Sequence, residues 1–345
     1  MAPLPPRDPE LTGVSFVVTI FDKRPYLPRV IAALARQSGM FEREFIFVDD
    51  GSSDGSADLV EELTRDWTER VVVLRQANRG ASAATNEGAR HARMTWLKLV
   101  DGDDLLIPWS TQHLLDAAEA TGQSFAYGEL GRYRCDDPDP LARALPQPPF
   151  GLERDGLARF IRNCPCNSSS VLVTAERYWQ AGGCDERLVS PDLALFLRIF
   201  ATGGAAYVEG PVALVPDEAP QRLSAQIRRS RYDSVMSLYY LVTETPHLPR
   251  RFVKLAYRRA LSRARRFHHS HGGALLSRHL LRGLASHLHV PATPGPSMYR
   301  ALGAFTEDGS SERPLAWMPG ATLARSRVTS RARDRAHQMQ PADKA

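Results

Sequence analysis

The first 200 residues alternate short β-branched runs with helical patterns, and this alternation constrains the fold more than any other feature of the chain. Strands are predicted at residues 14–19, 44–50, 70–76 and 95–101, and helices at residues 26–37, 56–67 and 81–92. Continuous apolar strands separated by helices are typical of a parallel sheet that is covered on both faces. The pattern therefore predicts a doubly wound α/β domain, whose ligands bind at the carboxyl ends of the strands.

Polar and acidic residues follow three of these strands. The first strand ends in TIFD (Thr19 to Asp22), the second in DDGSSDGS (Asp49 to Ser56) and the fourth in DGDD (Asp101 to Asp104). Closely spaced carboxylates repel one another unless a cation or ligand offsets the repulsion. Hard oxygen ligands of this kind suit Mg²⁺ or Mn²⁺ together with the phosphates of a substrate. The alternative interpretation is a solvated acidic turn, because Asp-Gly pairs are common in turns.

Six ordered segments of the chain resemble the family 2 inverting glycosyltransferases of GT-A fold. They lie between residues 14 and 200 and read VSFVVTIFD, YLPRVIAALARQ, EFIFVDDGSSDGS, ANRGASAATNEGARHA, WLKLVDGDDLLIP and AGGCDERLVSPDLALFLR. The resemblance implies a GT-A, mostly parallel sheet flanked by helices.

The resemblance also implies a donor site. Thr19 and Phe21 match positions that line the nucleotide base, and Asp50 matches an acid that accepts a hydrogen bond from it. Asn78 and Gly80 fall in the segment that approaches the diphosphate. Asn86, further along that segment, matches a position that shapes the donor pocket.

The same comparison implies a metal site in the Asp-x-Asp motif of DGDD. Asp101 matches the first carboxylate, near the ribose and the metal, and Asp103 matches the second, the direct ligand of Mn²⁺ or Mg²⁺. Asp104 continues the motif and is expected to orient its neighbours. A divalent cation there would stabilise the charge that grows on a departing diphosphate.

Asp192 takes the position of the general base that removes the proton of the acceptor hydroxyl. An acidic residue is also common in the first turn of a helix without any catalytic role, which is the alternative interpretation of Asp192. Asp185 and Glu186 are the other candidates for the general base. The chain departs from the family pattern next to this residue. Pro191 stands where a glutamate usually precedes the base, and Ala194 stands where a second acid usually follows. Asp22 replaces the asparagine that commonly ends the first-strand motif.

The predicted function is a metal-dependent inverting glycosyltransferase of hexosyltransferase type. It would move a sugar from a nucleoside-diphosphate donor, with UDP-sugar favoured, to a glycan, lipid-linked or small-molecule hydroxyl in cell-surface polysaccharide or glycoconjugate synthesis. The alternative is a catalytically weak or silent member that binds sugar nucleotides or acts as a scaffold. A nucleotidyltransferase or a dinucleotide dehydrogenase would need a glycine-rich loop after the first strand, and TIFDKRPYLP lacks one.

The back half of the chain is strongly basic. Residues 221–290 hold 14 Lys and Arg against two acids, although the net charge of all 345 residues is only +5. Three amphipathic helices are predicted there, as an extension to a GT-A domain at residues 13–220. Three interpretations stay open: a solvated face of helices that pack on the catalytic domain, a peripheral contact with an anionic membrane, or binding of a phosphorylated or acidic acceptor. No nucleic-acid-binding motif accompanies the charge, so nucleic acid is not an expected partner.

The remaining expectations concern the termini and the compartment. Residues 1–12 are predicted to be flexible without a secretory signal, and residues 291–345 to be a largely irregular, disordered tail. The four cysteines make no disulfide framework, and the Cys164-Pro165-Cys166 pair lacks the second pair that a structural zinc needs. We therefore expect reduced cysteines and a cytoplasmic protein. A peripheral contact on the inner face of the membrane is one of the three interpretations of the basic helices.

Overall fold

The computed structural model describes residues 13–142, 145–217, 227–272, 274 and 277–305. The flexible N-terminus predicted for residues 1–12 and the part of the predicted tail from residue 306 onward lie outside these ranges.

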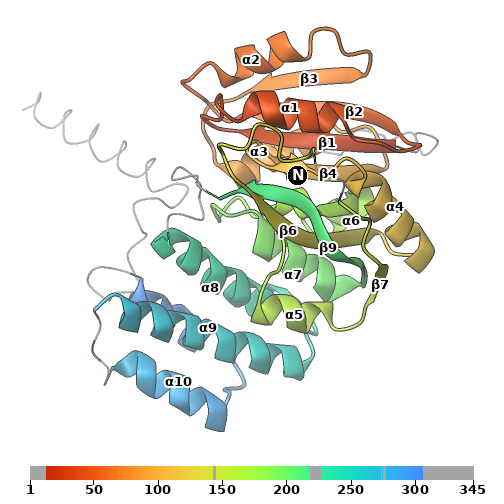
Figure 1. The fold of residues 1–345 in the computed structure, drawn as a ribbon. Helices are drawn as coiled ribbons and strands as arrows, with labels where there is room; N and C mark the ends of the chain where they lie inside the picture. The colour runs from red at the N-terminus through yellow and green to blue at the C-terminus, as the bar shows by residue number, and fades with distance from the viewer. Residues whose placement is uncertain (1–12, 143–144, 218–226, 273, 275–276, 306–345) are drawn as a thin grey trace, which may run out of the picture.

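Within the described residues, one mixed sheet of nine strands forms the centre of the molecule, in the order β3-β2-β1-β4-β8-β6-β9-β5 with β7 paired to β9 (Figure 1). The strands are β1 Gly13–Ile20, β2 Glu42–Asp49, β3 Arg70–Arg75, β4 Trp96–Asp101, β5 Leu105–Leu106, β6 Phe125–Tyr133, β7 Phe150–Glu153, β8 Val171–Thr174 and β9 Ala205–Pro216. Strands β3, β2, β1 and β4 are parallel, as predicted. Strand β8 runs antiparallel to β4 and begins the mixed half of the sheet.

Helices cover both faces of this sheet. They are α1 Leu27–Ala35, α2 Ser56–Leu63, α3 Ala81–His91, α4 Ser110–Thr121, α5 Gly156–Arg162, α6 Ala175–Gln180 and α7 Asp192–Thr202. Successive strand residues point to opposite faces. Phe16 and Val18 of β1 accordingly join a buried cluster with α1 and α4, whereas Val17 joins a second cluster with α3 and α7. Burial on both faces explains why these strands are apolar throughout.

The basic extension is helical, as predicted, and it packs on the sheet domain rather than forming a separate core. It contains α8 Ile227–Glu244, α9 Arg250–Ser270 and α10 Arg278–Leu288. Leu238 of α8 and Leu261 of α9 belong to the same buried cluster as Phe196 of α7. Figure 1 shows α8, α9 and α10 stacked on one side of the sheet domain. None of the helices in the described ranges combines the length and the apolar character that crossing a membrane requires.

The first part of the tail predicted to be irregular from residue 291 is largely helical in the residues that the structure describes. Residues Gly295–Ala301 form α11, and Leu302–Ala304 form a 3₁₀ turn. Met298 and Phe305 are fully buried in the cluster that contains α8 and α9. These two apolar side chains pack against α8 and α9. The prediction of an irregular segment was therefore wrong for residues 295–304, because it rested on the polar composition of the residues that follow.

The register of the parallel strands brings the predicted site residues to one edge. Thr19 of β1 lies beside Asp101 of β4, and Ile20 lies beside Asp49 of β2. Because these strands are parallel, their carboxyl ends meet at the same edge, and the polar residues that follow them come together there.

Candidate active site

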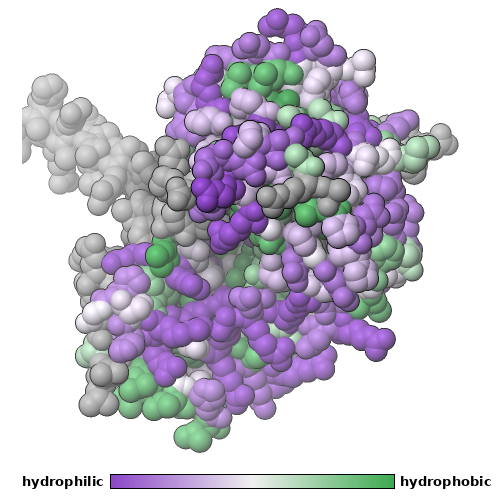
Figure 2. Space-filling view, viewed as in Figure 1, coloured by the Kyte–Doolittle hydropathy of each residue, from purple (hydrophilic) through white to green (hydrophobic). Residues whose placement is uncertain are grey.

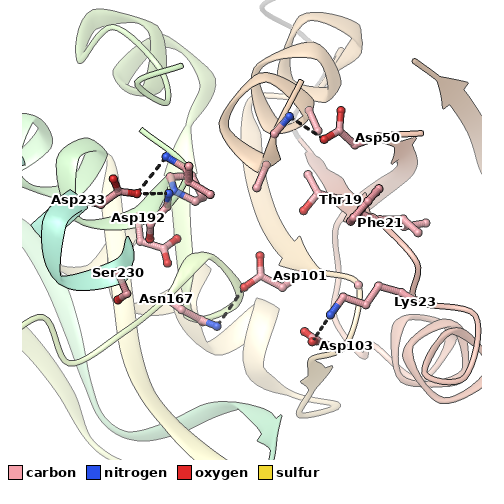
Figure 3. Close-up of a pocket in the computed structure, with 18 of the residues that line it drawn as sticks. Thr19, Phe21, Lys23, Asp50, Asp101, Asp103, Asn167, Asp192, Ser230 and Asp233 are labelled. Atoms are coloured by element: carbon pink, nitrogen blue, oxygen red, sulfur yellow. Dashed lines mark hydrogen bonds and ion pairs between the residues drawn. The ribbon is translucent and has the colours of Figure 1, made fainter. Parts of the chain in front are cut away.

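A pocket of about 650 Å³ opens at the carboxyl edge of the parallel strands. Eight of the residues predicted to form the site line this pocket: Thr19, Phe21, Asp50, Asn78, Gly80, Asp101, Asp103 and Asp192. Asn86 and Asp104 are not among the lining residues. Figure 3 shows Thr19, Phe21, Asp101 and Asp103 on one side, with Asp192 on the other. Their proximity is a finding of the structure, and their individual roles stay predictions.

Asp22 joins two of the strand-end loops. Its backbone has a φ of 50°, in the left-handed region that Asn and Asp tolerate better than other residues with a side chain. Its carboxylate accepts a hydrogen bond from the backbone N–H of Ser53 at 2.8 Å, and its own N–H donates to the Ser52 hydroxyl at 2.9 Å. The substitution of Asp for the usual Asn is therefore compatible with the turn that ends β1.

Asp50 holds the loop between β3 and α3 against the sheet. Its carboxylate accepts hydrogen bonds from Gln76 Nε2 at 2.7 Å and from the backbone N–H groups of Arg79 and Gly80 at 2.8 and 2.7 Å. Gly80 has a φ of 93°, which favours glycine, and it is the residue from which α3 begins. Asp50 thus brings Asn78 and the N-terminus of α3 to the pocket, where backbone N–H groups favour an anion such as a phosphate.

The DGDD turn at the end of β4 is compact. The Gly102 N–H donates to the carbonyl of Thr19 at 3.0 Å. A Cβ atom at position 102 would lie 2.8 Å from that carbonyl oxygen, so the turn requires glycine. Asp103 and Asp104 are almost fully buried.

Three polar partners compensate these carboxylates. Lys23 Nζ lies 2.7 Å from Asp103 Oδ2, in an ion pair that is largely shielded from water. The Asn167 amide donates to Asp104 Oδ2 at 2.6 Å and to Asp101 Oδ2 at 3.3 Å. Asp104 therefore shares a donor with Asp101, and its orienting role stays a prediction.

The third partner is Lys98, which is fully buried in the middle of β4. Its Nζ donates to the backbone carbonyl of Ser169. Burial lowers the pKa of Lys98 from 10.5 to about 7, although Asp104 and Asp101 act in the opposite direction. In its charged form Lys98 attracts the carboxylates of Asp104 and Asp101.

Asp192 is the first residue of α7 and lies across the pocket from the DGDD turn (Figure 3). The Ser168 hydroxyl donates a hydrogen bond to Asp192 Oδ1. Such a bond favours the charged carboxylate, the form that a general base needs. Pro191 also lines the pocket, whereas Ala194 is buried in the core cluster behind it. An acid at position 194 would thus be buried in this structure.

The segment before Asp192 is held by the basic extension. The carboxylate of Asp233 in α8 accepts hydrogen bonds from the backbone N–H groups of Val189 at 3.0 Å and Ser190 at 2.9 Å. Burial raises the pKa of Asp233 to about 6, against the effect of these two bonds. Arg229 and Ser230 of α8 line the pocket as well. The extension therefore contributes directly to the site.

The fallback bases and Asn86 lie behind the pocket lining. Asp185 pairs with Arg187 at 2.7 Å; burial acts to raise the pKa of Asp185, but the bonds from Arg187 lower it overall. Glu186 accepts a hydrogen bond from Asn86 Nδ2 at 2.9 Å. Asn86 Oδ1 also accepts a hydrogen bond from the Tyr178 hydroxyl at 2.6 Å, so Asn86 connects α3 to α6. It is not among the residues that line the pocket. These contacts leave Asp192 as the candidate base that the pocket contains.

Five functional candidates in the pocket were not predicted: Lys23, Asn167, Arg229, Ser230 and Asp233. Sequence signals existed for two of them. A lysine follows the TIFD turn directly, and Asn167 begins the polar run NSSS after a Pro-containing segment. Nothing in the local sequence of α8 marks its three residues as part of a pocket.

Comparison with known proteins agrees with this arrangement. Residues 15–168 match the sequence family described as glycosyl transferase family 2. The matched segment contains the four parallel strands and the DGDD turn, and it spans a little under half of the chain. It is 36% identical over 106 residues to the uncharacterized glycosyltransferase EpsJ of Bacillus subtilis, covering 31% of this chain and 30% of EpsJ. It is 31% identical over 126 residues to the succinoglycan biosynthesis protein ExoO of Rhizobium meliloti, covering 36% and 35% of the two chains. The matched stretches thus span about a third of the length of these relatives.

Solved structures show that the fold is GT-A. The crystal structure of S. aureus TarS residues 1–349 superposes with a TM-score of 0.60 at 14% identity, covering 92% of each chain. The structure of the same TarS fragment with UDP-GlcNAc superposes with a TM-score of 0.59 at 15% identity, covering 87% of this chain and 82% of TarS. The likeness extends beyond the segment that matches the family by sequence.

Proposed function

We propose that this protein is a glycosyltransferase that moves a sugar from a nucleoside-diphosphate donor to an acceptor hydroxyl, with inversion at the anomeric carbon. One observation carries the proposal: the donor-site and base candidates, which come from separate segments of the chain, line one pocket. Asp192 faces Asp101 and Asp103 across it, as an attack from the side opposite the leaving group requires (Figure 3).

In the proposed reaction the acceptor oxygen bonds to the anomeric carbon while the bond from that carbon to the diphosphate breaks. The diphosphate leaves with the electron pair, and the acceptor proton passes to the carboxylate of Asp192. The Ser168 hydroxyl orients this carboxylate. In this proposal the N–H groups at the start of α3 and the Lys23 ammonium bind the diphosphate.

The proposal includes Mn²⁺ or Mg²⁺, which Asp101 and Asp103 would hold. The described residues contain no cluster of three or more His, Cys, Asp or Glu arranged for a metal. Two carboxylates suit such an ion when substrate phosphates complete its coordination, so the donor set fits a metal that binds together with the donor. A bound metal would supply Lewis-acid stabilisation of the leaving diphosphate. The 2.7 Å contact of Lys23 with Asp103 would then have to rearrange.

UDP-sugar is the proposed donor, supported by the TarS structures with UDP and UDP-GlcNAc. A polysaccharide or glycoconjugate acceptor is supported by the similarity to the succinoglycan biosynthesis protein ExoO. We also propose a cytoplasmic location with a peripheral membrane contact through residues 221–290. The four cysteines are free thiols, which is consistent with a reducing compartment.

The second candidate function is a family member that binds sugar nucleotides without efficient catalysis. The observation that favours it is Pro191, which lines the pocket at a position where the family resemblance implies a carboxylate. In this alternative the pocket binds the sugar nucleotide, but the residues around Asp192 do not activate an acceptor hydroxyl.

Calorimetric titration of the purified protein with UDP, GDP and dTDP, each with and without Mn²⁺, tests the proposal. We expect one nucleotide to bind with a requirement for metal, and Asp103→Ala to lose this binding. Asp58→Ala, which removes an exposed carboxylate of α2 outside the pocket, is the matched control. If no nucleotide binds in the presence of metal, the donor-site proposal is wrong.

Transfer assays with the matching sugar nucleotide then separate the two candidate functions. Asp192→Asn is expected to bind the donor like the wild type but to lose transfer, because Asn cannot accept the acceptor proton. Equal transfer by the wild type and Asp192→Asn would refute the assignment of the base.

A further inference from the structure

Helix α10 presents its apolar side away from the protein. Its buried residues are His279, Gly283 and Ser286, whereas Leu281, Leu284 and Leu288 are 65%, 54% and 92% exposed. A surface helix ordinarily turns its apolar stripe toward the core and its polar side toward water. Figure 2 shows hydrophobic residues gathered on the surface at the position of α10 in Figure 1.

Polar contacts with α9 hold α10 in this orientation. The Arg258 guanidinium donates to the backbone carbonyls of Ser286 at 3.1 Å and His287 at 3.2 Å. The aliphatic part of Arg265 packs against Gly283, where a Cβ atom would lie 3.3 Å from its Cδ. Rotating the leucines inward would break these contacts and bury the leucines against arginines.

The exposed leucines form one continuous stripe. Positions 281, 284 and 288 are three and four residues apart, so their side chains lie on the same side of the helix. A contiguous apolar surface bordered by polar residues marks an interaction site.

The charge around the stripe favours an anionic partner. Arg278 is exposed and Arg282 is half-buried on α10 itself, and neither α9 nor α10 contains an acidic residue. The two acids of residues 221–290 are engaged elsewhere, since Asp233 is buried and Glu244 pairs with Arg187 at 2.7 Å. A second copy of the chain on this face would bring like charges together, which is costly. An anionic membrane offers both kinds of contact, since its acyl boundary can receive the leucines and its headgroups can bind the cationic side chains.

We propose that α10 docks the protein on an anionic membrane, with Leu281, Leu284 and Leu288 inserted at the level of the headgroups. Arg278, which is exposed and three residues before Leu281, would then lie on the lipid phosphates. The membrane contact included in the proposed function would thus be made by α10. This docking does not depend on whether the protein transfers a sugar. A donor pocket formed partly by α8 would then lie in a protein held at the membrane, where a lipid-linked acceptor resides.

Flotation of the full-length chain with lipid vesicles tests this surface. The probes are vesicles of phosphatidylcholine alone and of phosphatidylcholine with phosphatidylglycerol at three to one. We expect binding only to the second type, and at least tenfold weaker binding when Leu281, Leu284 and Leu288 are all changed to Ser. The matched control changes Leu63 and Met40, which are exposed elsewhere on the molecule, to Ser and should bind like the wild type.

The outcomes are distinct. Equal binding by the triple variant and the wild type overturns the proposal, as does equal binding of the wild type to both vesicle types. A wild type that fails to bind vesicles but self-associates in light scattering, with loss of association in the triple variant, assigns the face to a second copy instead. Circular dichroism checks that the variant is folded. Nucleotide titration of the triple variant should match the wild type, so failure of membrane docking is distinguishable from failure of the proposed function.

Discussion

Replacing Lys98 by Met removes the buried amine beneath the DGDD turn and keeps a side chain of similar length. In the folded protein burial lowers the pKa of Lys98 from 10.5 to about 7, so folding disfavours its charged form. Between these two pH values the unfolded chain holds a proton at this position that the folded chain has released. Stability therefore rises with pH across the interval, because the unfolded state binds more protons.

The magnitude follows from the size of the shift. The cost of burying the ammonium is largest at and below pH 7 and disappears above pH 10.5. At 1.36 kcal/mol per pKa unit, this cost falls by about 2 kcal/mol between pH 7 and pH 9. Lys98→Met has no such group, so the free energy of unfolding of the wild type should rise relative to that of the variant by this amount.

Urea unfolding of both proteins at pH 7, 8 and 9, followed by circular dichroism, measures the difference. Other titrating groups are common to the two chains and cancel to first order. A difference that stays constant from pH 7 to pH 9 would refute the reasoning. It would mean that Asp101 and Asp104 keep Lys98 charged in the folded state and outweigh the effect of burial.

Two further predictions concern packing and the candidate base. Gly88→Ala should lower the free energy of unfolding by about 2 kcal/mol despite the better helix propensity of Ala, because its Cβ would lie 2.4 Å from a methyl group of Val17. Urea denaturation checks this, and a more stable variant would contradict the close contact of α3 with the sheet. Ser168→Ala removes the hydrogen bond to Asp192. We expect kcat to fall roughly tenfold with little change in the KM for the donor, since a bond to a charged group is worth about 1.5 kcal/mol or more. Steady-state kinetics over a range of pH should also show the acid limb moving to higher pH, and an unchanged profile would exclude this positioning role.

Local sequence was enough to predict the sheet edge and the polar residues that meet there. Apolar runs of strand length alternate with helical periods, and such strands are parallel, so the residues after Thr19, Asp50 and Asp101 had to meet at one edge. The roles expected for these residues came from the family resemblance and await the experiments above.

The partners of those residues could not be predicted in the same way. Lys23 and Asp103 are 80 positions apart, and Asn167 and Asp104 are 63 apart, so neither pair leaves a local pattern. Asp233 reaches the backbone next to Asp192 from a helix whose sequence resembles any amphipathic helix.

The sequence by itself determined that the chain contains an α/β sheet with an acidic strand end and a basic helical extension, because strand and helix periods and charge are properties of neighbouring residues. Only the tertiary structure decided which polar groups offset the charge of the acidic turn, since Lys23 and Asn167 approach it through packing. The same holds for α10. Its period shows that the helix has an apolar side, but the contacts of Arg258 and Gly283 decide that this side faces outward.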